Sequence, residues 1–497
     1  MIGIKFLENN KLYVIGNAEW AFGIPFPKNV IARPEFSKIN RVQNTEGIIT
    51  HGTIQKEWTG AKKPRGGPRF PAQQPGRAAG KGDSMKQIIK RITAVLAVFS
   101  LLTVIGSGTL ANSIPETFTV TKGQSLTMNY PLRLESRTDS GALAAEKTGG
   151  GTEKYETTLN AFGIFPIKKA EVTVAEPKYV IPSGRLFGLK MFTAGVLVVG
   201  LSDIQTSSGM ENPAQKAGLR EGDLILSINS REVSTNEEVA AAVQDCGGKP
   251  LTLEVQRKNM GFTVEFTPVK SSVSGKYMGG FWVRDSSAGI GTMTFYDPDT
   301  GVFAGLGHPI CDIDTGEILP LMTGEIVNAN LVGVVKGVSG IPGELRGVFV
   351  ENTQLGTLKS NGETGVYGFS KDSGFTGDKI QVAMKQEIKL GEAEILATVV
   401  PGEPQRYQCM IEKVNYNDES PSKNMVIHIT DKRLLDATGG IVQGMSGSPI
   451  VQDGKLIGAV THVFINEPEK GYAIFAENML KTASETAAQQ QSENKAS

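Results

Sequence analysis

The sequence predicts a mainly β protein built from several domains, and three observations support this. The chain has 497 residues, more than one ordinary domain contains, so about three domains are expected. Its 59 glycines stand among alternating Val, Ile and Thr, a composition typical of short strands joined by tight turns. Hydrophobic residues make up 39% of the chain and charged residues 21%, which fits a globular protein. Acidic and basic residues are equal in number, so no overall field favours nucleic acid as a partner.

The first 84 residues differ from the rest of the chain. Residues 61–84 are rich in Gly, Pro and basic residues, a composition typical of disorder. They precede a segment of a kind that normally opens a chain. We therefore expect residues 1–84 to be an extension of the gene model, with Met85 as the natural start. A disordered basic tail in the cytoplasm is the alternative.

Residues 85–111 form a membrane-directing segment. Three positive charges in residues 86–91 precede nineteen uncharged residues, Ile92 to Leu110. This arrangement is typical of a signal peptide, here with a weak cleavage site after Ala111. The apolar run is also just long enough for a retained transmembrane anchor. Positive charge ahead of the segment predicts that everything after it is exported.

Two domains are expected next. Residues 112–177 alternate polar and apolar side chains with glycine breaks, which predicts a small β-domain. Residues 178–268 predict an α+β unit, in which a helix near residue 235 begins with a capping box of Thr235 and Glu238. The string AxxAGLxxGDxIxxINxxxV, from Ala214 to Val233, resembles a PDZ domain.

The resemblance to PDZ domains implies a peptide partner. In that family a glycine-containing loop binds the C-terminal carboxylate of a peptide, and the peptide adds a strand to the edge of the sheet. The matching positions in this chain are Phe187, Gly188 and Leu189. In the alternative interpretation the groove serves only internal packing.

The C-terminal half predicts a second kind of β structure. Residues 271–480 consist of short strands and glycine-rich turns, which predict a closed or double β-barrel. Residues 481–497 are rich in Ala, Gln and Ser and predict a disordered tail. The isolated cysteines Cys246, Cys311 and Cys409 form no CxxC pair, which argues against a zinc or thiol redox site. We expect neither a metal nor another cofactor.

The motif GMSGSP at residues 444–449 carries the clearest chemistry. A serine between glycines on a tight loop presents its Oγ while nearby backbone N–H groups converge, as acyl transfer requires. Ser446 is therefore the candidate nucleophile, although Gly, Ser and Pro also form ordinary turns. The general base must be a histidine, and the chain has four. His308 follows an apolar strand in a glycine-rich turn and is preferred over His462, while His428 lies in an alternating strand and His51 in the suspected extension.

The third member of such a site is a carboxylate that orients the imidazole. Asp431 ends a predicted strand fifteen residues before the serine. Asp312 and Asp314 lie close to His308 in the sequence and compete with it. Both could equally be turn formers, which is a common use of Asp.

The loop resembles the G-x-S-G-x-P loop of chymotrypsin-like serine peptidases, which implies the N–H groups of Gly444 and Ser446 as the oxyanion hole. A PDZ domain followed by GHPI at 307–310, TGGIVQGMSGSPI at 438–450 and AVTHVF at 459–464 resembles the stage IV sporulation protein B peptidases. This resemblance implies His308, Asp431 and Ser446 as the catalytic residues, in that order along the chain.

The family resemblance also implies a setting. Such peptidases are exported across the forespore membrane and act in the intermembrane space. They cleave themselves and then a membrane-bound regulator of an intramembrane protease, which triggers processing of pro-sigma-K. Two other functions agree with the residues: a catalytically inactive PDZ adaptor, and a broad quality-control serine protease of the cell envelope.

Overall fold

A computed structural model describes residues 114–496, apart from 129–132, 138–145, 148–152, 163, 259, 371–374 and 417–419, together with 5–7, 11–14, 90 and 93. The chain divides into two units, Met1–Phe22 with Gly106–Ser497, and Gly23–Ile105, and every element below belongs to the first. The predicted extension and the membrane-directing segment lie outside the described residues, apart from these few positions. In the described ranges, no helix is both long and apolar enough to cross a membrane.

Two short strands come from the first residues of the chain. They are β1 (Lys5–Leu7) and β2 (Lys11–Val14), which pair with each other, and β2 also pairs with a later strand at Gly347 and Val348. A six-stranded sheet follows, where the alternating pattern predicted a small β-domain. Its strands are β3 (Thr117–Thr121), β4 (Thr127–Met128), β5 (Leu134–Arg137), β6 (Glu146–Lys147), β7 (Glu153–Ala161) and β8 (Phe165–Ala175).

Six strands then close into a first barrel. Each pairs with the next, and β10 pairs with β19 to complete the ring. The order around the ring is β10 (Leu186–Leu201), β21 (Leu321–Val335), β22 (Glu344–Gly362), β23 (Gly365–Ser370), β20 (Val302–Gly305) and β19 (Phe281–Asp297). The apolar side chains inside include Phe187, Leu189, Phe303, Ile326 and Leu358, all fully buried. The alternating Leu, Phe and Val residues of these strands therefore fill a barrel core.

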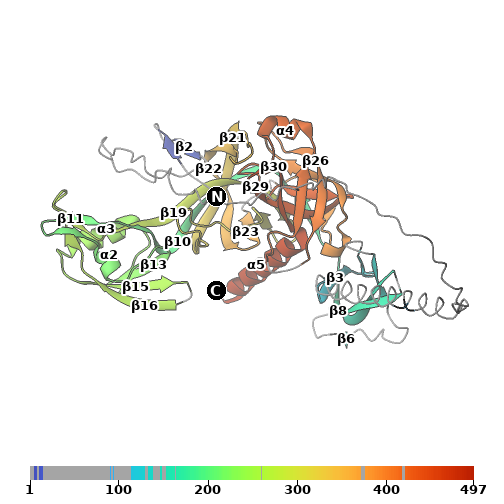
Figure 1. The fold of residues 1–497 in the computed structure, drawn as a ribbon, viewed down its shortest axis with the longest axis horizontal. Coiled ribbons are helices and arrows are strands. Elements are labelled where there is room, and N and C mark those ends of the chain that lie inside the picture. The colour runs from blue at the N-terminus through green and yellow to red at the C-terminus, as the bar shows by residue number, and fades with distance from the viewer. Residues whose placement is uncertain are drawn as a thin grey trace, which may run out of the picture. The chain divides into compact units, whose positions relative to one another are not determined.

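The PDZ unit is inserted into this barrel between β10 and β19. The second half of β10 pairs with β13, and on its other edge Leu197 and Leu201 pair with Arg284 and Phe281 of β19. The unit thus includes a strand beyond its predicted limit at residue 268. In Figure 1 β10 and β19 run side by side from the PDZ unit into the barrel.

The remaining elements of the insertion are short strands and two helices, in agreement with the predicted α+β unit. They are β11 (Ile204–Thr206), β12 (Gly209–Glu211), α2 (Pro213–Lys216), β13 (Asp223–Ile228), β14 (Arg231–Glu232), α3 (Asn236–Asp245), β15 (Leu251–Arg257), β16 (Met260–Phe266), β17 (Val269–Lys270) and β18 (Tyr277–Met278). The capping box of α3 is confirmed, with Thr235 as N-cap and Glu238 bonded back to the N-cap backbone.

The predicted carboxylate-binding loop is corrected by the structure. Phe187, Gly188 and Leu189 lie near the start of β10, where β19 pairs along one edge and β21 along the other. No peptide can add a strand there, because both edges are already used. The two large side chains point into the barrel core, and a Cβ on Gly188 would lie 2.6 Å from the Phe349 ring.

A second, closed barrel contains six strands in the order β25, β26, β27, β30, β29 and β28. Their bounds are β25 (Gly391–Ala397), β26 (Gln405–Val414), β27 (Met425–Ile429), β28 (Pro449–Gln452), β29 (Lys455–Phe464) and β30 (Glu467–Phe475). Together the two rings confirm the predicted chymotrypsin-like β-barrel fold. The connecting elements are β9 (Tyr179–Pro182), β24 (Ile380–Gln381), the 3-10 turn η1 (Lys385–Glu387) and α4 (Lys432–Thr438).

The C-terminal segment is a helix, which corrects the expected disordered tail. Helix α5 runs from Ala476 to Ala496. Met479, Ala483 and Ala487 are buried and are spaced so that they share one face, which packs against β20, β23 and β29. The Ala- and Gln-rich composition suggested disorder, but these residue types are also good helix formers.

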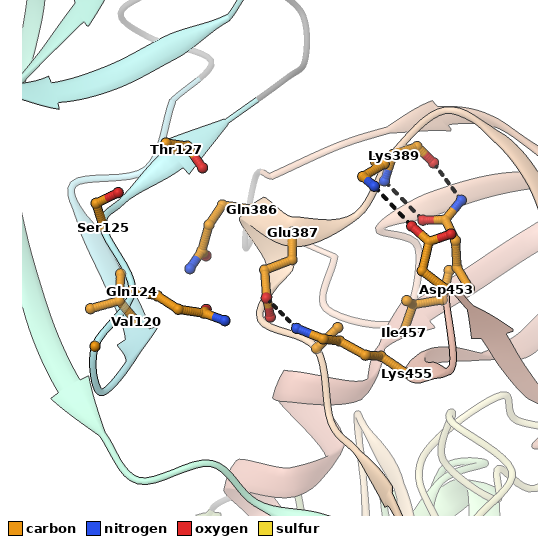
Figure 2. A pocket seen from close by; sticks show the side chains of 13 residues that line it. Val120, Gln124, Ser125, Thr127, Gln386, Glu387, Lys389, Asp453, Lys455 and Ile457 are labelled. Atoms are coloured by element: carbon orange, nitrogen blue, oxygen red, sulfur yellow. Dashed lines mark hydrogen bonds and ion pairs between the residues drawn. The ribbon is translucent and has the colours of Figure 1, made fainter.

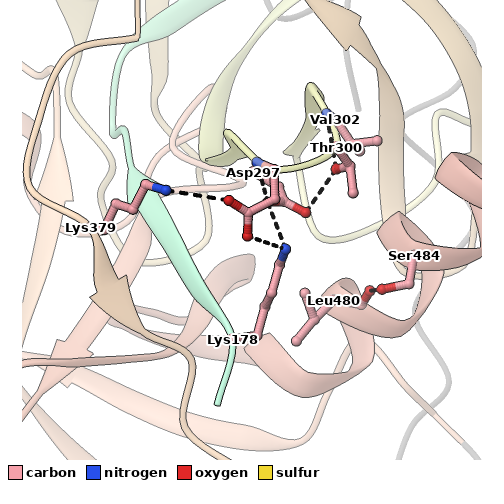
Figure 3. A network of polar contacts seen from close by, with 8 residues as sticks. Lys178, Asp297, Thr300, Val302, Lys379, Leu480 and Ser484 are labelled. Carbon is pink, nitrogen blue, oxygen red and sulfur yellow. Dashed lines mark hydrogen bonds and ion pairs between the residues drawn. The ribbon is translucent and has the colours of Figure 1, made fainter. Parts of the chain in front are cut away.

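An ion pair fixes the end of β19 that is far from the PDZ unit. Lys178, just before β9, lies 2.9 Å from the buried carboxylate of Asp297 and 2.8 Å from Asp299. Figure 3 shows Lys178 directed at Asp297, with Thr300 bonded to the same carboxylate. β19 is thus held at both ends, by the PDZ sheet and by this pair.

Candidate active site

The Ser446 loop is a tight turn made possible by two glycines. Gly444 and Gly447 have φ angles of 95° and 96°, in the region that side chains disfavour. The turn is closed by the amides of Met445 and Ser448, which donate to Val442 and Met445 at 3.1 and 2.9 Å. Strand β28 begins directly afterwards.

Two threonines of β19, in the first barrel, donate hydrogen bonds to this loop. Thr292 donates its amide to the Ser446 carbonyl at 3.0 Å and its hydroxyl to the Gly444 carbonyl at 2.7 Å. Thr294 donates its hydroxyl to the Gly447 carbonyl at 2.8 Å. Sequence reasoning missed both threonines, because polar residues in an alternating strand normally face solvent.

These hydrogen bonds orient the backbone carbonyl groups of the loop towards β19. The amide hydrogens of Gly444 and Ser446, which the resemblance assigned to the oxyanion hole, donate to no acceptor in the described part of the chain. Free, fixed N–H groups beside a serine hydroxyl are what a developing oxyanion needs. Their catalytic role stays a prediction that this geometry favours.

His308 lies in a strained turn at the end of β20. Leu306 and Gly307 before it have φ angles of 65° and 71°, a conformation rare for leucine. The imidazole is 9% exposed, and its Nδ1 lies 2.8 Å from the Pro309 carbonyl. Because a carbonyl can only accept, Nδ1 carries the hydrogen and Nε2 of the neutral ring is free to act as a base.

The structure brings Ser446, His308 and His462 together across the two barrels. The Ser446 hydroxyl donates to the Thr461 carbonyl of β29 at 2.8 Å, and His462 is the next residue along that strand. The His308 and His462 rings lie 5.1 Å apart, centroid to centroid. Gly307 packs against Thr461, since a Cβ there would lie 2.9 Å from the Thr461 methyl group.

The predicted carboxylate is placed elsewhere. Asp431 is the N-cap of α4 and binds the Arg433 amide at 2.9 Å and its guanidinium at 2.7 Å. This pairing with Arg433 lowers the pKa of Asp431 to about 2. Within the described residues no hydrogen bond joins Asp431 to His308, so its part in a triad stays a prediction without geometric support.

The competing residues also have other partners. Asp312 and Asp314 both pair with Arg284, and Asp312 caps its own turn through the amides of Asp314 and Thr315. His428 lies on the outside of the second barrel and contacts Glu412 at 3.0 Å. In the described ranges no carboxylate is hydrogen-bonded to His308.

Burial depresses the basicity of both site histidines. The pKa of His308 falls from 6.5 to about 3, mainly through burial and secondly through the neighbouring His462. The pKa of His462 falls to about 4, again mainly through burial, with Lys423 adding to the effect. Both rings are therefore neutral at pH 7, the form in which a histidine accepts a proton.

These shifts predict an acid-sensitive fold. Between pH 6.5 and about 3 the unfolded chain binds a proton at His308 that the folded protein does not. Stability is therefore complete above about pH 6.5 and is lost as pH falls through this window. We expect urea unfolding at pH 7 and pH 5 to show a smaller difference in His308→Asn than in the wild type. His428→Asn is the control, and an unchanged difference in His308→Asn would contradict the assignment.

One cavity in the described part of the chain does not include the serine in its lining. It has a volume of about 520 Å³ and is lined by the turn between β3 and β4 and by residues around η1 and the β28–β29 turn. Figure 2 shows Lys455 bonded to Glu387 and Lys389 to Asp453 beside it. Its cations are thus already paired, and none of the predicted catalytic residues lines it.

Comparison with known proteins finds two family models. One, described as SpoIVB peptidase S55, matches residues 275–480, and a PDZ domain model matches residues 207–257. These are the two families that the sequence motifs indicated.

Similar curated proteins are proteases that match over short stretches. "Probable protease eep" of Enterococcus faecalis is 32% identical over 99 residues, 19% of this chain and 24% of that protein. "Regulator of sigma-E protease RseP" of Salmonella typhimurium is 35% identical over 79 residues, 16% of this chain and 17% of that protein. The chain thus spans a quarter or less of each. A solved structure, Rv3671c of M. tuberculosis in an inactive mutant form, has 14% identity and a TM-score of 0.20 over 40% of this chain and 83% of that one, too low a score to support an inference.

Proposed function

We propose that the protein is a self-cleaving serine endopeptidase with Ser446 as nucleophile and His308 as general base, and the premise is that residues 275–480 match the SpoIVB peptidase S55 family model. The observation that carries the proposal is the Ser446 loop, which combines a hydroxyl with two amide hydrogens that find no acceptor among the described residues, close to the neutral pair of His308 and His462.

The mechanism follows from these groups. Ser446 turns its hydroxyl from the Thr461 carbonyl to Nε2 of His308, which takes the proton as Oγ attacks the carbonyl carbon of the substrate. The carbonyl oxygen gains the electron pair and binds the amides of Gly444 and Ser446. His308 then gives the proton to the leaving amine, and water releases the acyl group by the same steps in reverse order.

The biological role proposed is signalling during endospore formation. The protein is exported across, or anchored in, the forespore membrane and acts in the intermembrane space. There it cleaves itself and a membrane-bound regulator, which triggers intramembrane processing of pro-sigma-K. Support comes from the S55 family match and from relatives that are themselves named as regulators of a sigma factor.

The PDZ unit suits a substrate-selecting role in this proposal. PDZ domains bind extended peptides by adding a strand to a sheet edge. A C-terminal peptide of a protein partner is therefore the proposed ligand, bound at a place other than Phe187 to Leu189, whose strand edges are occupied.

The first test uses the full chain without substitutions. We expect a fluorophosphonate probe to label Ser446 and intact mass spectrometry to show self-cleavage at a few sites that the probe prevents. Labelling combined with extensive digestion of unfolded casein would support the quality-control protease instead. Absence of both labelling and cleavage would support the inactive PDZ adaptor and contradict the proposal.

A further inference from the structure

The second histidine of the site, His462, has no role in the mechanism above. It lies on β29, where it pairs with Tyr472 of β30 and directly follows Thr461. Thr461 is the residue whose carbonyl binds the Ser446 hydroxyl at 2.8 Å. A rigid strand therefore places His462 beside the nucleophile, and its ring lies 5.1 Å from that of His308 at an interplanar angle of 41°.

The Nδ1 atom of His462 is buried and finds no hydrogen-bond partner among the described residues. Other buried side-chain atoms of the described residues, such as the Ser448 hydroxyl, are also unpaired, so this atom indicates a role only together with the ring contact to His308. Packing alone would be served as well by an apolar side chain, which would leave no polar atom unpaired.

His308 in turn lacks the support that a base in a catalytic triad receives. Its Nδ1 hydrogen binds the Pro309 carbonyl, which fixes the tautomer but carries no full negative charge. The carboxylate of Asp431 is held by Arg433 and by the Gln408 amide. The aromatic ring beside His308 belongs to His462, with the two centroids 5.1 Å apart.

We propose that His462 is the positioning residue for His308, holding its ring so that Nε2 faces Ser446. This role rests on the proposed function. His462 forms and breaks no bond: the Ser446 proton moves to His308 and from there to the leaving amine. Its contribution is the contact and, as pH falls, its own positive charge.

The charge effect has a defined sign. The charged or titratable groups that act on the pair are His308 from the first barrel, His462 from β29 and Lys423 from the segment before β27. A positive charge on His462 lowers the pKa of His308. Its charge then opposes protonation of His308, because two adjacent cations repel each other in a buried site. His462 therefore keeps His308 neutral to lower pH.

The test measures how fast a fluorophosphonate labels Ser446 from pH 3 to pH 9 in the full chain. We expect His462→Gln to lower the rate at pH 8 by roughly tenfold or more, because the base is no longer held in place. We also expect the acid limb of its pH profile to move to higher pH. His428→Gln is the matched control, since it removes a strand imidazole on the outside of the same barrel and should leave rate and profile as in the wild type.

The outcomes separate the two proposals. A wild-type protein that labels, with a His462→Gln profile no different from that of His428→Gln, overturns the positioning role and leaves the peptidase. A lower rate with an unshifted acid limb also overturns it, because loss of packing alone explains that result. A wild-type protein that does not label overturns the proposed function and this role with it. Thermal unfolding of each variant shows whether His462→Gln folds. NMR titration of the His308 ring resonances in Ser446→Ala, with and without His462→Gln, compares the protonation of His308 without any turnover.

Discussion

Ser446→Ala is expected to slow self-cleavage by roughly 10⁶-fold, the loss seen when a serine peptidase loses its nucleophile. The fold should be unchanged, because the hydroxyl contributes a single hydrogen bond, to the Thr461 carbonyl. The measurement is the first-order rate of chain cleavage, followed by intact mass spectrometry at a fixed protein concentration.

Ser448→Ala is the matched control. Ser448 lies two residues further along the same loop, is fully buried, and its hydroxyl has no hydrogen-bond partner in the described part of the chain. Its removal therefore leaves no partner unpaired and should change neither stability nor rate appreciably. Equal rates in Ser446→Ala and the wild type would show that another group performs the cleavage.

Gly447→Ala is expected to be the most damaging single-methyl addition near the site. At its φ of 96° any side chain is strained, and the added Cβ would overlap the Thr292 carbonyl oxygen and lie 2.5 Å from the Leu306 amide nitrogen. Both are backbone atoms of the first barrel and cannot rotate away. We expect a loss in unfolding free energy of roughly 3 kcal/mol or more and no labelling of Ser446.

Gly454→Ala separates the cost of the strained backbone from the cost of the steric overlap. Gly454 also has a positive φ, 75°, but nothing lies within 4 Å of the Cβ it would gain. It should therefore lose only about 1 kcal/mol, the cost of the backbone conformation alone. Urea unfolding of both variants gives the comparison, and equal losses would mean that the contact between the loop and β19 is not tight.

Local signals in the sequence were sufficient for the elements that depend on neighbouring residues. The capping box at Thr235, the AGL and GD motifs of the PDZ unit and the glycines around Ser446 all act within a few positions. His308 could be selected because it follows an apolar strand in a glycine-rich turn.

Features that depend on distant partners could not be predicted in the same way. Phe187 to Leu189 lie ahead of the PDZ motif in the sequence, yet their strand partners are Asn328 to Ile326 and Gly291 to Gly289, about 140 and 100 residues later. Asp431 was chosen for its spacing from the serine, but its carboxylate is bound by the guanidinium of Arg433, two residues later. The hydrogen bond that Thr292 donates to the Ser446 loop forms only when the second barrel packs against the first.

The insertion of the PDZ unit between β10 and β19 has a consequence for the order of events during synthesis. When Leu186 to Thr193 leave the ribosome, both of their partner strands are still to be made, and the whole of residues 202–280 comes first. The PDZ motifs can fold in that interval from contacts close in the sequence, whereas the first barrel must wait for pairings of long sequence separation. Only after β19 has docked can Thr292 and Thr294 receive the Ser446 loop, which is made some 150 residues later. The Ser446 loop is therefore assembled last. Until both barrels have closed, a nascent chain does not hold Ser446 in the position that the proposed reaction needs.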